Sequence, residues 1–262
     1  MTAVYTSGSQ IDHYEIIRQL GHGGMSRVYL ACDAQDQQKV VLKFPNDELI
    51  GDIAVYERYK REAEIGNRVR HPHVQHLINP GEHHSDEYLV MEYIHGRSLR
   101  EFLEEKHNQP LPVPEALRIA LQLCDALVYC HEHGVFHRDI KPENVMVQDN
   151  GDIKIIDFGI ALLEGARRVT WRGLTGMVGT PDYMSPEQLK GERGNAASDI
   201  YAVGILLYEM LCGLPPFYDE NVNTMYHKIL YDPLRFPDDI DSKAKSLLIA
   251  VNSSNPYSLI IF

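Results

Sequence analysis

HRDIKPEN at positions 137–144 is the most specific stretch of this sequence, and DFG follows it at positions 157–159. Two short apolar runs lie between these motifs, at residues 145–147 and 153–156, on either side of the turn-forming sequence DNG. We therefore expect two strands joined by a tight turn. The needs of folding alone do not explain why the eight residues of HRDIKPEN occur together. We therefore expect this motif and DFG to take part in a chemical reaction.

Upstream of these motifs, the chain predicts a β-rich unit with one helix. Strands are expected at residues 14–20, 27–32, 39–44 and 87–93. Residues 54–69 have the spacing of an amphipathic helix, and Glu62 falls on its inward stripe. Lys43 ends an apolar strand, where an unpaired charge would be costly to bury. Because each charge explains the other, we expect Lys43 and Glu62 to pair.

Downstream, the sequence predicts a mainly helical unit. A helix is expected from residue 115 onward. Its apolar face is expected to consist of Leu117, Ala120, Leu121, Cys124, Leu127 and Val128. Residues 200–211 are apolar nearly all round and predict a buried central helix, with Asp199 as its N-cap. Residues 158–187 carry little periodicity, as a long functional loop would.

The composition narrows the class of protein. The chain has 262 residues, of which 44% are hydrophobic and 24% charged, which is ordinary for a globular protein. Its formal net charge of -12 argues against a nucleic-acid-binding surface, since such surfaces neutralise phosphates with Lys and Arg. The four cysteines include no C-x-x-C pair, which predicts a reducing compartment and a cytoplasmic location. Residues 1–10 lack the features of a signal peptide, and no apolar run is long enough to span a bilayer.

GHGGMSRV at positions 21–28 lies between two expected strands. Glycines there let backbone N–H groups approach phosphates without interference from a Cβ atom. A strand follows the turn, which excludes a Rossmann motif because that motif continues into a helix. Taken alone, the pattern is equally typical of an ordinary glycine-rich β-turn.

Together these motifs resemble those of protein kinases, in the expected order over residues 14–240. The details GGMS, REA and SPEQ are most similar to those of bacterial eukaryotic-type serine/threonine kinases. The resemblance implies an α+β, two-lobed protein-kinase fold, with a small β-rich N-lobe that carries one main helix and a larger, mainly helical C-lobe. It implies Asp139 as the catalytic base and Lys141 near the γ-phosphate. It also implies Asn144 and Asp157 as metal ligands.

The N-lobe motifs imply an ATP site. Lys43 would hold the α- and β-phosphates and pair with Glu62, and residues 91–94 resemble the gatekeeper and hinge, whose backbone would bind adenine. The residues implied around the nucleotide are Leu20, Gly21, His22, Gly23, Gly24, Met25, Ser26, Arg27, Val28, Val41, Lys43, Met91, Glu92 and Ile94. Two of them depart from the family pattern, since Ser26 replaces a glycine and Val41 an alanine. The implied cofactors are ATP and Mg²⁺, with Mn²⁺ as an alternative.

GTPDYMSPE at positions 179–187 resembles the end of a kinase activation segment. Thr180 matches the threonine that contacts the catalytic aspartate and lysine, while Thr170 and Thr175 lie upstream. Arg138 directly precedes the catalytic aspartate, and such an arginine can pair with a phosphothreonine. We therefore expect autophosphorylation of Thr170 or Thr175 to order the loop. The alternative is that both are merely solvated loop residues.

Two further residues are implied to be structural. Asp199 resembles the aspartate that braces the catalytic loop, and Glu187 resembles the glutamate that pairs with a later arginine. No arginine follows Arg235, so we expect a truncated C-terminal end and lower stability than that of a complete kinase domain. The expected division is an N-terminal extension at 1–13 and a kinase domain at 14–262, with the N-lobe at about 14–93 and the C-lobe at about 97–262.

The implied function is transfer of the γ-phosphoryl group of ATP to serine or threonine hydroxyls of protein substrates in signalling, including autophosphorylation. A pseudokinase that binds nucleotide without catalysis is one alternative, opposed by the complete set of catalytic residues. A small-molecule phosphotransferase of the same fold is another, opposed by the TPDYMSPE segment. We expect no nucleic-acid partner and no membrane segment in this chain. The resemblance also allows a weak homodimer through the N-lobe.

Overall fold

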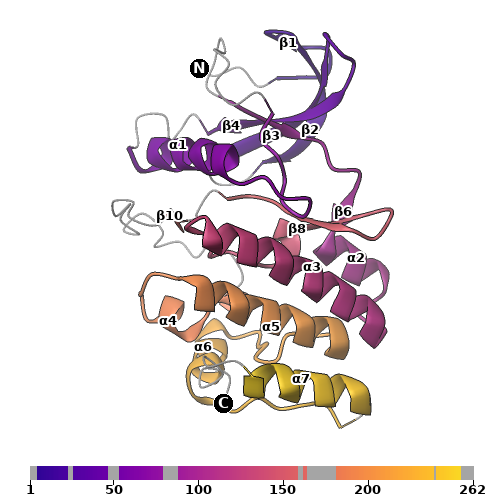
Figure 1. Ribbon diagram of the computed structural model, residues 1–262, viewed down its shortest axis with the longest axis vertical. Coiled ribbons are helices and arrows are strands. Elements are labelled where there is room, and N and C mark those ends of the chain that lie inside the picture. The colour runs from indigo at the N-terminus through magenta and orange to yellow at the C-terminus, as the bar shows by residue number, and fades with distance from the viewer. Residues whose placement is uncertain are drawn as a thin grey trace.

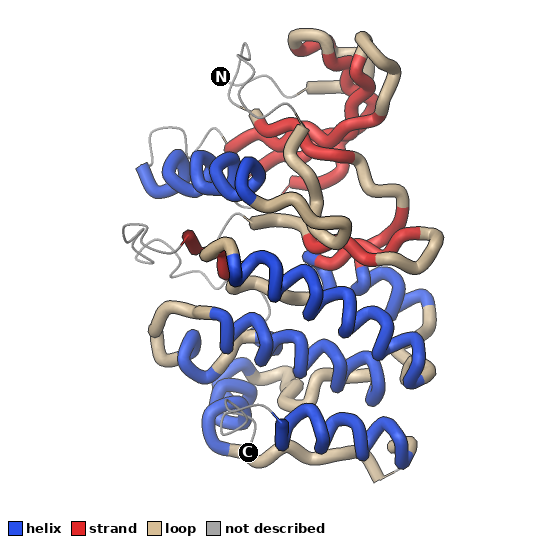
Figure 2. The backbone as a smooth tube through the Cα atoms, viewed as in Figure 1, coloured by secondary structure: helices blue, strands red, loops and turns tan. Residues whose placement is uncertain are grey.

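The computed structural model describes residues 5–22, 26–46, 53–78, 88–158, 162–163, 181–238 and 240–254, which form two lobes (Figure 1). Figure 2 shows the longest strands gathered in the upper lobe with one helix, and the other helices stacked in the lower lobe. We call these the N-lobe and the C-lobe. The predicted two-lobed α+β fold is confirmed. Within the described ranges, no helix combines the length and apolar character needed to cross a bilayer.

The N-lobe is built on a five-stranded antiparallel sheet in the order β1-β2-β3-β4-β5. Its strands are β1 (Gln10–Ile11), β2 (Tyr14–His22), β3 (Ser26–Asp33), β4 (Lys39–Pro45) and β5 (Leu89–Glu92). Along β2, Tyr14 and Ile16 are buried and the residue between them is exposed, as the alternating pleat of a half-buried strand requires. The register places Gly21, Val28 and Lys43 in one row across the sheet.

Two hydrophobic clusters hold the lobes. The smaller one is aromatic and lies in the N-lobe, where Tyr29, Phe44 and Tyr88 make ring contacts with centroids 5.0–5.7 Å apart. Tyr5 packs on this cluster from outside the predicted kinase domain. The larger cluster fills the C-lobe and also takes in Ile65 of helix α1 (Ile53–Arg68). The C-terminal half of α1 is therefore packed against the C-lobe core, although its sequence position belongs to the N-lobe.

Helices dominate the C-lobe. They are α2 (Leu99–Glu105), α3 (Val113–Glu132), α4 (Pro186–Leu189), α5 (Ala196–Cys212), α6 (Val222–Tyr231) and α7 (Ser242–Ser254). In Figure 1, α3, α5 and α7 lie in successive rows down the lobe, and α5 is buried nearly all round, as predicted. The smaller elements are the strands β6 (Gly96–Ser98), β7 (Val135–Phe136), β8 (Val145–Gln148), β9 (Ile153–Ile155) and β10 (Leu162–Leu163), and the 3-10 turns η2 (Pro142–Asn144) and η4 (Pro181–Tyr183). Strands β8 and β9 pair as the expected hairpin between the two motifs.

Two expectations for the helices are wrong. Asp199 is not the N-cap of α5, because the helix already begins at Ala196 and the side chain of Asn195 caps it by accepting the N–H of Ala197. In α3, Leu121 and Val128 are 65% and 53% exposed, so they lie outside the buried face. The α3 sequence is apolar on more than one side, so spacing alone does not identify which stripe is buried.

Candidate active site

Lys43 lies on β4, where the two lobes meet, and contacts two carboxylates. Its Nζ donates to Oε1 and Oε2 of Glu62 at 2.7 and 2.9 Å. It also donates to Oδ1 of Asp157 at 2.9 Å. The exposed fractions of the Lys43 and Glu62 side chains are 13% and 10%, while that of Asp157 is 50%. The ammonium group of Lys43 on β4 therefore connects helix α1 with the DFG aspartate. Half of the Asp157 side chain remains accessible to a further ligand.

The charges in this cluster stabilise one another. Burial disfavours the charged form of Lys43, but the adjacent carboxylates of Glu62 and Asp157 outweigh this effect and raise the pKa of Lys43. Burial raises the pKa of Glu62, and the ammonium of Lys43 opposes that rise. Lys43 is therefore a fixed cation, which suits a contact with phosphate oxygens.

Asp139 is held from two sides. Lys141 Nζ lies 2.7 Å from its Oδ2. Asn144 Nδ2 donates to the same oxygen at 2.9 Å and to the Asp139 carbonyl at 2.8 Å. Since the Asn144 amide nitrogen has two hydrogens and both are used on Asp139, its Oδ1 is left as an acceptor for another ligand. The N–H of Ile156 donates to the Asn144 carbonyl at 2.9 Å. This bond holds the residue next to Asp157 against Asn144.

Asp199 is bonded to the backbone of the HRD motif. It is 1% exposed and accepts the backbone N–H groups of His137 at 2.9 Å and Arg138 at 2.6 Å. The His131 ring Nε2 lies 2.8 Å from the same carboxylate. Arg138 has φ +70° and Asp157 has φ +62°, a region that residues other than glycine seldom adopt. Such backbone persists only where surrounding contacts enforce it, and Asp199 supplies those contacts at Arg138.

Asn144 and Asp157 are the candidate metal ligands. They offer one amide oxygen and one carboxylate, and hard divalent cations prefer oxygen ligands of these kinds. Asp157 contacts Lys43 and Asn144 contacts Asp139, so a cation held by Asp157 and Asn144 would be close to both of these groups. The donor set therefore fits a small divalent cation.

The described residues of the predicted nucleotide-binding set lie on or beside β2 to β5. Val41 on β4 and Met91 on β5 are direct partners across the sheet, and both are buried. Ile94 is also buried, while Leu20 near the end of β2 is 37% exposed. Gly21 and His22 end β2, and Ser26, Arg27 and Val28 begin β3. Gly23, Gly24, Met25, Thr170, Thr175 and Thr180 lie outside the described residues.

The side chain of Glu187 on α4 is hydrogen-bonded to Ser198. Its Oε1 accepts the hydroxyl of Ser198 at 2.6 Å. In the part of the chain that the structure describes, its Oε2 and the hydroxyl of Tyr201 are buried without hydrogen bonds. The neighbouring Gln188 donates to the Arg138 carbonyl at 2.9 Å. Helix α4 is therefore bonded to the segment that carries Asp139.

One partly buried network, centred on Arg100, was not predicted from the sequence. Arg100 on α2 donates to Glu209 at 2.7 Å, to Tyr183 at 2.7 Å and to Glu143 at 3.0 Å. The Tyr183 hydroxyl donates to Glu209 at 2.5 Å. The available signal was a glutamate, Glu209, within the otherwise apolar run 200–211. Its partners could not be read from the sequence because they lie 26 and 109 residues away.

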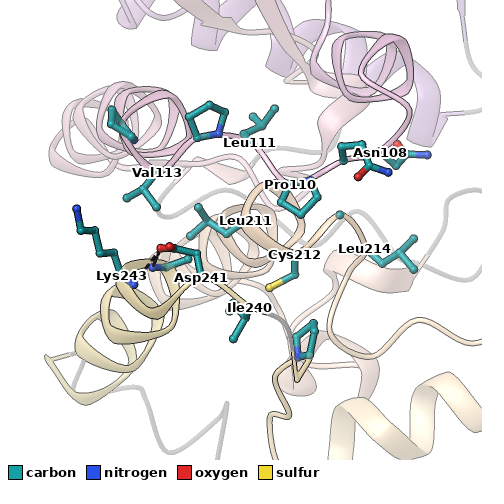
Figure 3. A pocket seen from close by; sticks show the side chains of 16 residues that line it. Asn108, Pro110, Leu111, Val113, Leu211, Cys212, Leu214, Ile240, Asp241 and Lys243 are labelled. Carbon is teal, nitrogen blue, oxygen red and sulfur yellow. Dashed lines mark hydrogen bonds between the residues drawn. The ribbon is translucent and has the colours of Figure 1, made fainter.

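A pocket of about 840 Å³ lies at the other end of the C-lobe (Figure 3). Its walls come from the segment before α3, the end of α5 and the start of α7, with Leu111, Leu211 and Ile240 among the labelled residues. Asp241 caps α7 there through the N–H groups of Lys243 and Ala244. The pocket contains none of the predicted site residues, so we place the chemistry at Lys43 and Asp139 instead.

Comparisons with known proteins agree with this geometry. Residues 14–258 match the family model of the protein kinase domain. The chain is 36% identical over 255 residues to serine/threonine-protein kinase PknB of Mycolicibacterium smegmatis, covering 94% of this chain and 40% of that protein. It is 39% identical over 226 residues to a probable serine/threonine-protein kinase of Streptomyces coelicolor, covering 84% of this chain and 33% of that protein. It is 33% identical over 248 residues to serine/threonine-protein kinase PrkC of Bacillus subtilis, covering 93% of this chain and 38% of that protein. The chain thus spans 33 to 40% of the length of these bacterial relatives. The chain belongs to the protein kinase domain family.

Proposed function

We propose that this domain transfers the γ-phosphoryl group of ATP to serine and threonine hydroxyls of proteins, including its own, with Mg²⁺ as the metal. The observation that carries the proposal is the cluster in which Lys43 contacts both Glu62 and Asp157. The bacterial relatives are named serine/threonine kinases, which supports the same reaction.

In this proposal the protein acts mainly by positioning and by neutralising charge, because phosphoryl transfer needs little covalent chemistry from side chains. Lys43 presents its ammonium to the α- and β-phosphates, and Lys141 presents its own near the γ-phosphate. Asp139 accepts the proton of the substrate hydroxyl. Its Oδ2 is already bonded to Lys141 and Asn144, so Oδ1 is the oxygen that orients the hydroxyl.

Asn144 Oδ1 and the Asp157 carboxylate would hold the metal ion, which when bound neutralises negative charge on the phosphate oxygens. Oxygen ligands suit both Mg²⁺ and Mn²⁺. Activity measured with each ion in turn, at a fixed ATP concentration, gives the preference. Higher activity with Mn²⁺ at equal concentrations contradicts the choice of Mg²⁺.

The test of the function is incubation with labelled ATP, Mg²⁺ and a generic basic protein, beside an Asp139→Asn control. We expect transfer of label by the wild type and a loss of at least about 100-fold in the variant, with the Kd for ATP unchanged. Binding of ATP by the wild type without transfer to any protein would overturn the proposal in favour of a pseudokinase.

Regulation and assembly extend the proposal. Phosphorylation of Thr170 or Thr175 would add charge that Arg138 can pair with. Phosphopeptide mapping of active enzyme is expected to find one of the two modified, and finding neither contradicts this part.

A weak homodimer through the N-lobe is expected to show as a concentration-dependent sedimentation coefficient, and a constant coefficient contradicts it.

A further inference from the structure

Gln75 connects the predicted hinge to the strand that leads to Asp157. Its backbone N–H donates to the carbonyl of Ile155 at 2.9 Å, two residues before Asp157. Its side-chain Nε2 donates to the backbone carbonyl of Glu92 at 3.0 Å. The side chain is half-buried. Gln75 therefore stands between the segment proposed to bind the base and the aspartate proposed to bind the metal.

The chemistry of the carboxamide determines which atom faces which partner. A backbone carbonyl can only accept, so the group that contacts Glu92 must be the amide nitrogen of Gln75. The other end of the same amide is an acceptor, Oε1, attached to the same carbon. Among the described residues, no hydrogen bond reaches Oε1. Gln75 thus presents an unused acceptor within a few ångströms of the Glu92 carbonyl.

Glu92 is fixed on several sides, so its carbonyl has a defined direction. Its N–H donates to the carbonyl of His76 at 3.0 Å. Its Oε1 accepts from Lys154 at 2.7 Å and from the N–H of His76 at 2.8 Å. A carbonyl oxygen has two lone pairs, and Gln75 uses one of them. The second lone pair is left for a ligand at the hinge.

We propose that Gln75 recognises the exocyclic amine of adenine and so selects ATP over GTP. This inference rests on the proposed function, in which the backbone of residues 91–94 binds the base. The 6-amino group of adenine carries two N–H donors, which match the Glu92 carbonyl and Gln75 Oε1. The 6-oxo group of guanine carries none and would face two acceptors. Rotating the Gln75 amide to donate to that oxygen would break its bond to Glu92.

Nucleotide binding, measured without catalysis, tests the inference. Gln75→Met keeps the length of the side chain but removes both hydrogen-bonding groups. We expect the Kd for ATP to rise about threefold to tenfold, which corresponds to one lost hydrogen bond. The Kd for purine riboside triphosphate, which lacks the amino group, should stay within about twofold of the wild type, and the preference for ATP over GTP should fall. Gln38→Met, at an exposed position before β4, is the matched control and should change none of these ratios.

The possible outcomes distinguish a failure of the role inferred for Gln75 from a failure of the proposed kinase function. Retained binding of the purine analogue by Gln75→Met shows that the nucleotide site is intact. An ATP-to-analogue ratio equal to that of the wild type then overturns the role of Gln75 and leaves the kinase function standing. An equal loss of affinity for ATP and the analogue also overturns it, since the effect would not depend on the amine. A wild-type protein that binds no nucleoside triphosphate overturns the proposed function, and the inference with it.

Discussion

Lys43 and Glu62 form a close ion pair whose side chains are 13% and 10% exposed. In Lys43→Met, Glu62 keeps its buried position but loses its cation, and such a change typically costs about 3–5 kcal/mol of the free energy of unfolding. In Lys43→Met/Glu62→Leu both charges are absent, so most of that free energy should return. Urea denaturation of the two variants and the wild type measures the difference. Equal losses in the single and double variants contradict the argument.

The deficit of Lys43→Met should also depend on pH. Burial raises the pKa of Glu62 above its ordinary 4.5, and without Lys43 nothing nearby opposes the rise as strongly. Between 4.5 and the raised pKa the folded state binds more protons than the unfolded state, so stability falls as pH rises. The gap to the wild type should therefore be larger at pH 8 than at pH 5. Lys43→Met/Glu62→Gln, which cannot titrate there, should show no such change, and a pH-independent gap in Lys43→Met contradicts the expectation.

Single residues differ in how far the sequence predicts them. Lys43 and Glu62 could be paired in advance because each was a charge in an apolar pattern and needed a partner. Gln75 carried no such signal, since a polar residue in an irregular segment is ordinary. Arg100 and Glu209 meet across 109 residues, and no local periodicity reports a contact of that separation. The contact between Lys43 and Glu62 was therefore more predictable from the sequence than the contacts of Gln75 and Arg100.

At the scale of elements, Asn195 and Asp199 lie at the start of α5 and have different tasks. Asp199 accepts two backbone N–H groups of the catalytic loop, whereas Asn195 only caps the helix. Asp199→Asn replaces one acceptor oxygen by an NH₂ group, which cannot accept. We expect kcat to fall about 10- to 100-fold while the KM for ATP changes less than about twofold. Asn195→Ala should cost about 1 kcal/mol of stability with kcat unchanged, and equal kcat losses in the two variants contradict a positioning role.

Two glycines that follow helices of the C-lobe, Gly213 and Gly191, offer a second comparison. Gly213 follows α5 with φ +88°, and a Cβ atom there would lie 2.4 Å from the carbonyl oxygen of Asn108. Gly191 follows α4 with φ +81°, and a Cβ atom there would meet nothing within 4 Å. Gly191→Ala should cost about 1 kcal/mol from backbone strain, and Gly213→Ala about 3 kcal/mol or more because a backbone clash is added. Guanidinium denaturation measures both, and equal costs contradict the steric argument.

Element boundaries and faces were predicted less well than element types. The apolar run 200–211 predicted α5, but the helix begins earlier because Asn195 provides a better cap than Asp199, whose oxygens bind the catalytic loop. In α3 the predicted face included Leu121 and Val128, which are exposed. The side of α3 that is buried is the side that packs against α5. A contact between two helices belongs to the tertiary structure, so the α3 sequence alone does not specify it.

At the scale of the whole molecule, the two lobes are connected by more than the contacts of Lys43 with Glu62 and Asp157. Ile65 near the end of α1 is 1% exposed and belongs to the C-lobe cluster, one turn of helix from Glu62. The contact of Glu62 with Lys43 is therefore supported by the C-lobe core as well as by the N-lobe. The two-lobed fold was predictable because the motifs occur in order along the chain, but this sharing of a core across lobes follows only from three-dimensional packing.

The partly buried network around Arg100 connects α2, η2, η4 and α5, so its loss should affect the whole C-lobe. Tyr183 is 5% exposed, and its hydroxyl both accepts from Arg100 and donates to Glu209. Burial raises the pKa of Tyr183, which keeps the phenol protonated as a donor. Tyr183→Phe leaves a buried carboxylate oxygen of Glu209 without that donor and should cost about 1–3 kcal/mol.

Calorimetric melting of Tyr183→Phe, Arg100→Met and the double variant tests whether this network acts as one unit. Residues in one hydrogen-bond network couple by about 0.5–3 kcal/mol, so the double variant should lose clearly less than the sum of the single losses. Tyr218→Phe is the matched control, because Tyr218 is 48% exposed and its change should stay within about 0.5 kcal/mol of the wild type. Strict additivity of the two network substitutions would show that Arg100 and Tyr183 stabilise the C-lobe independently, and the argument for a single connecting network would then be wrong.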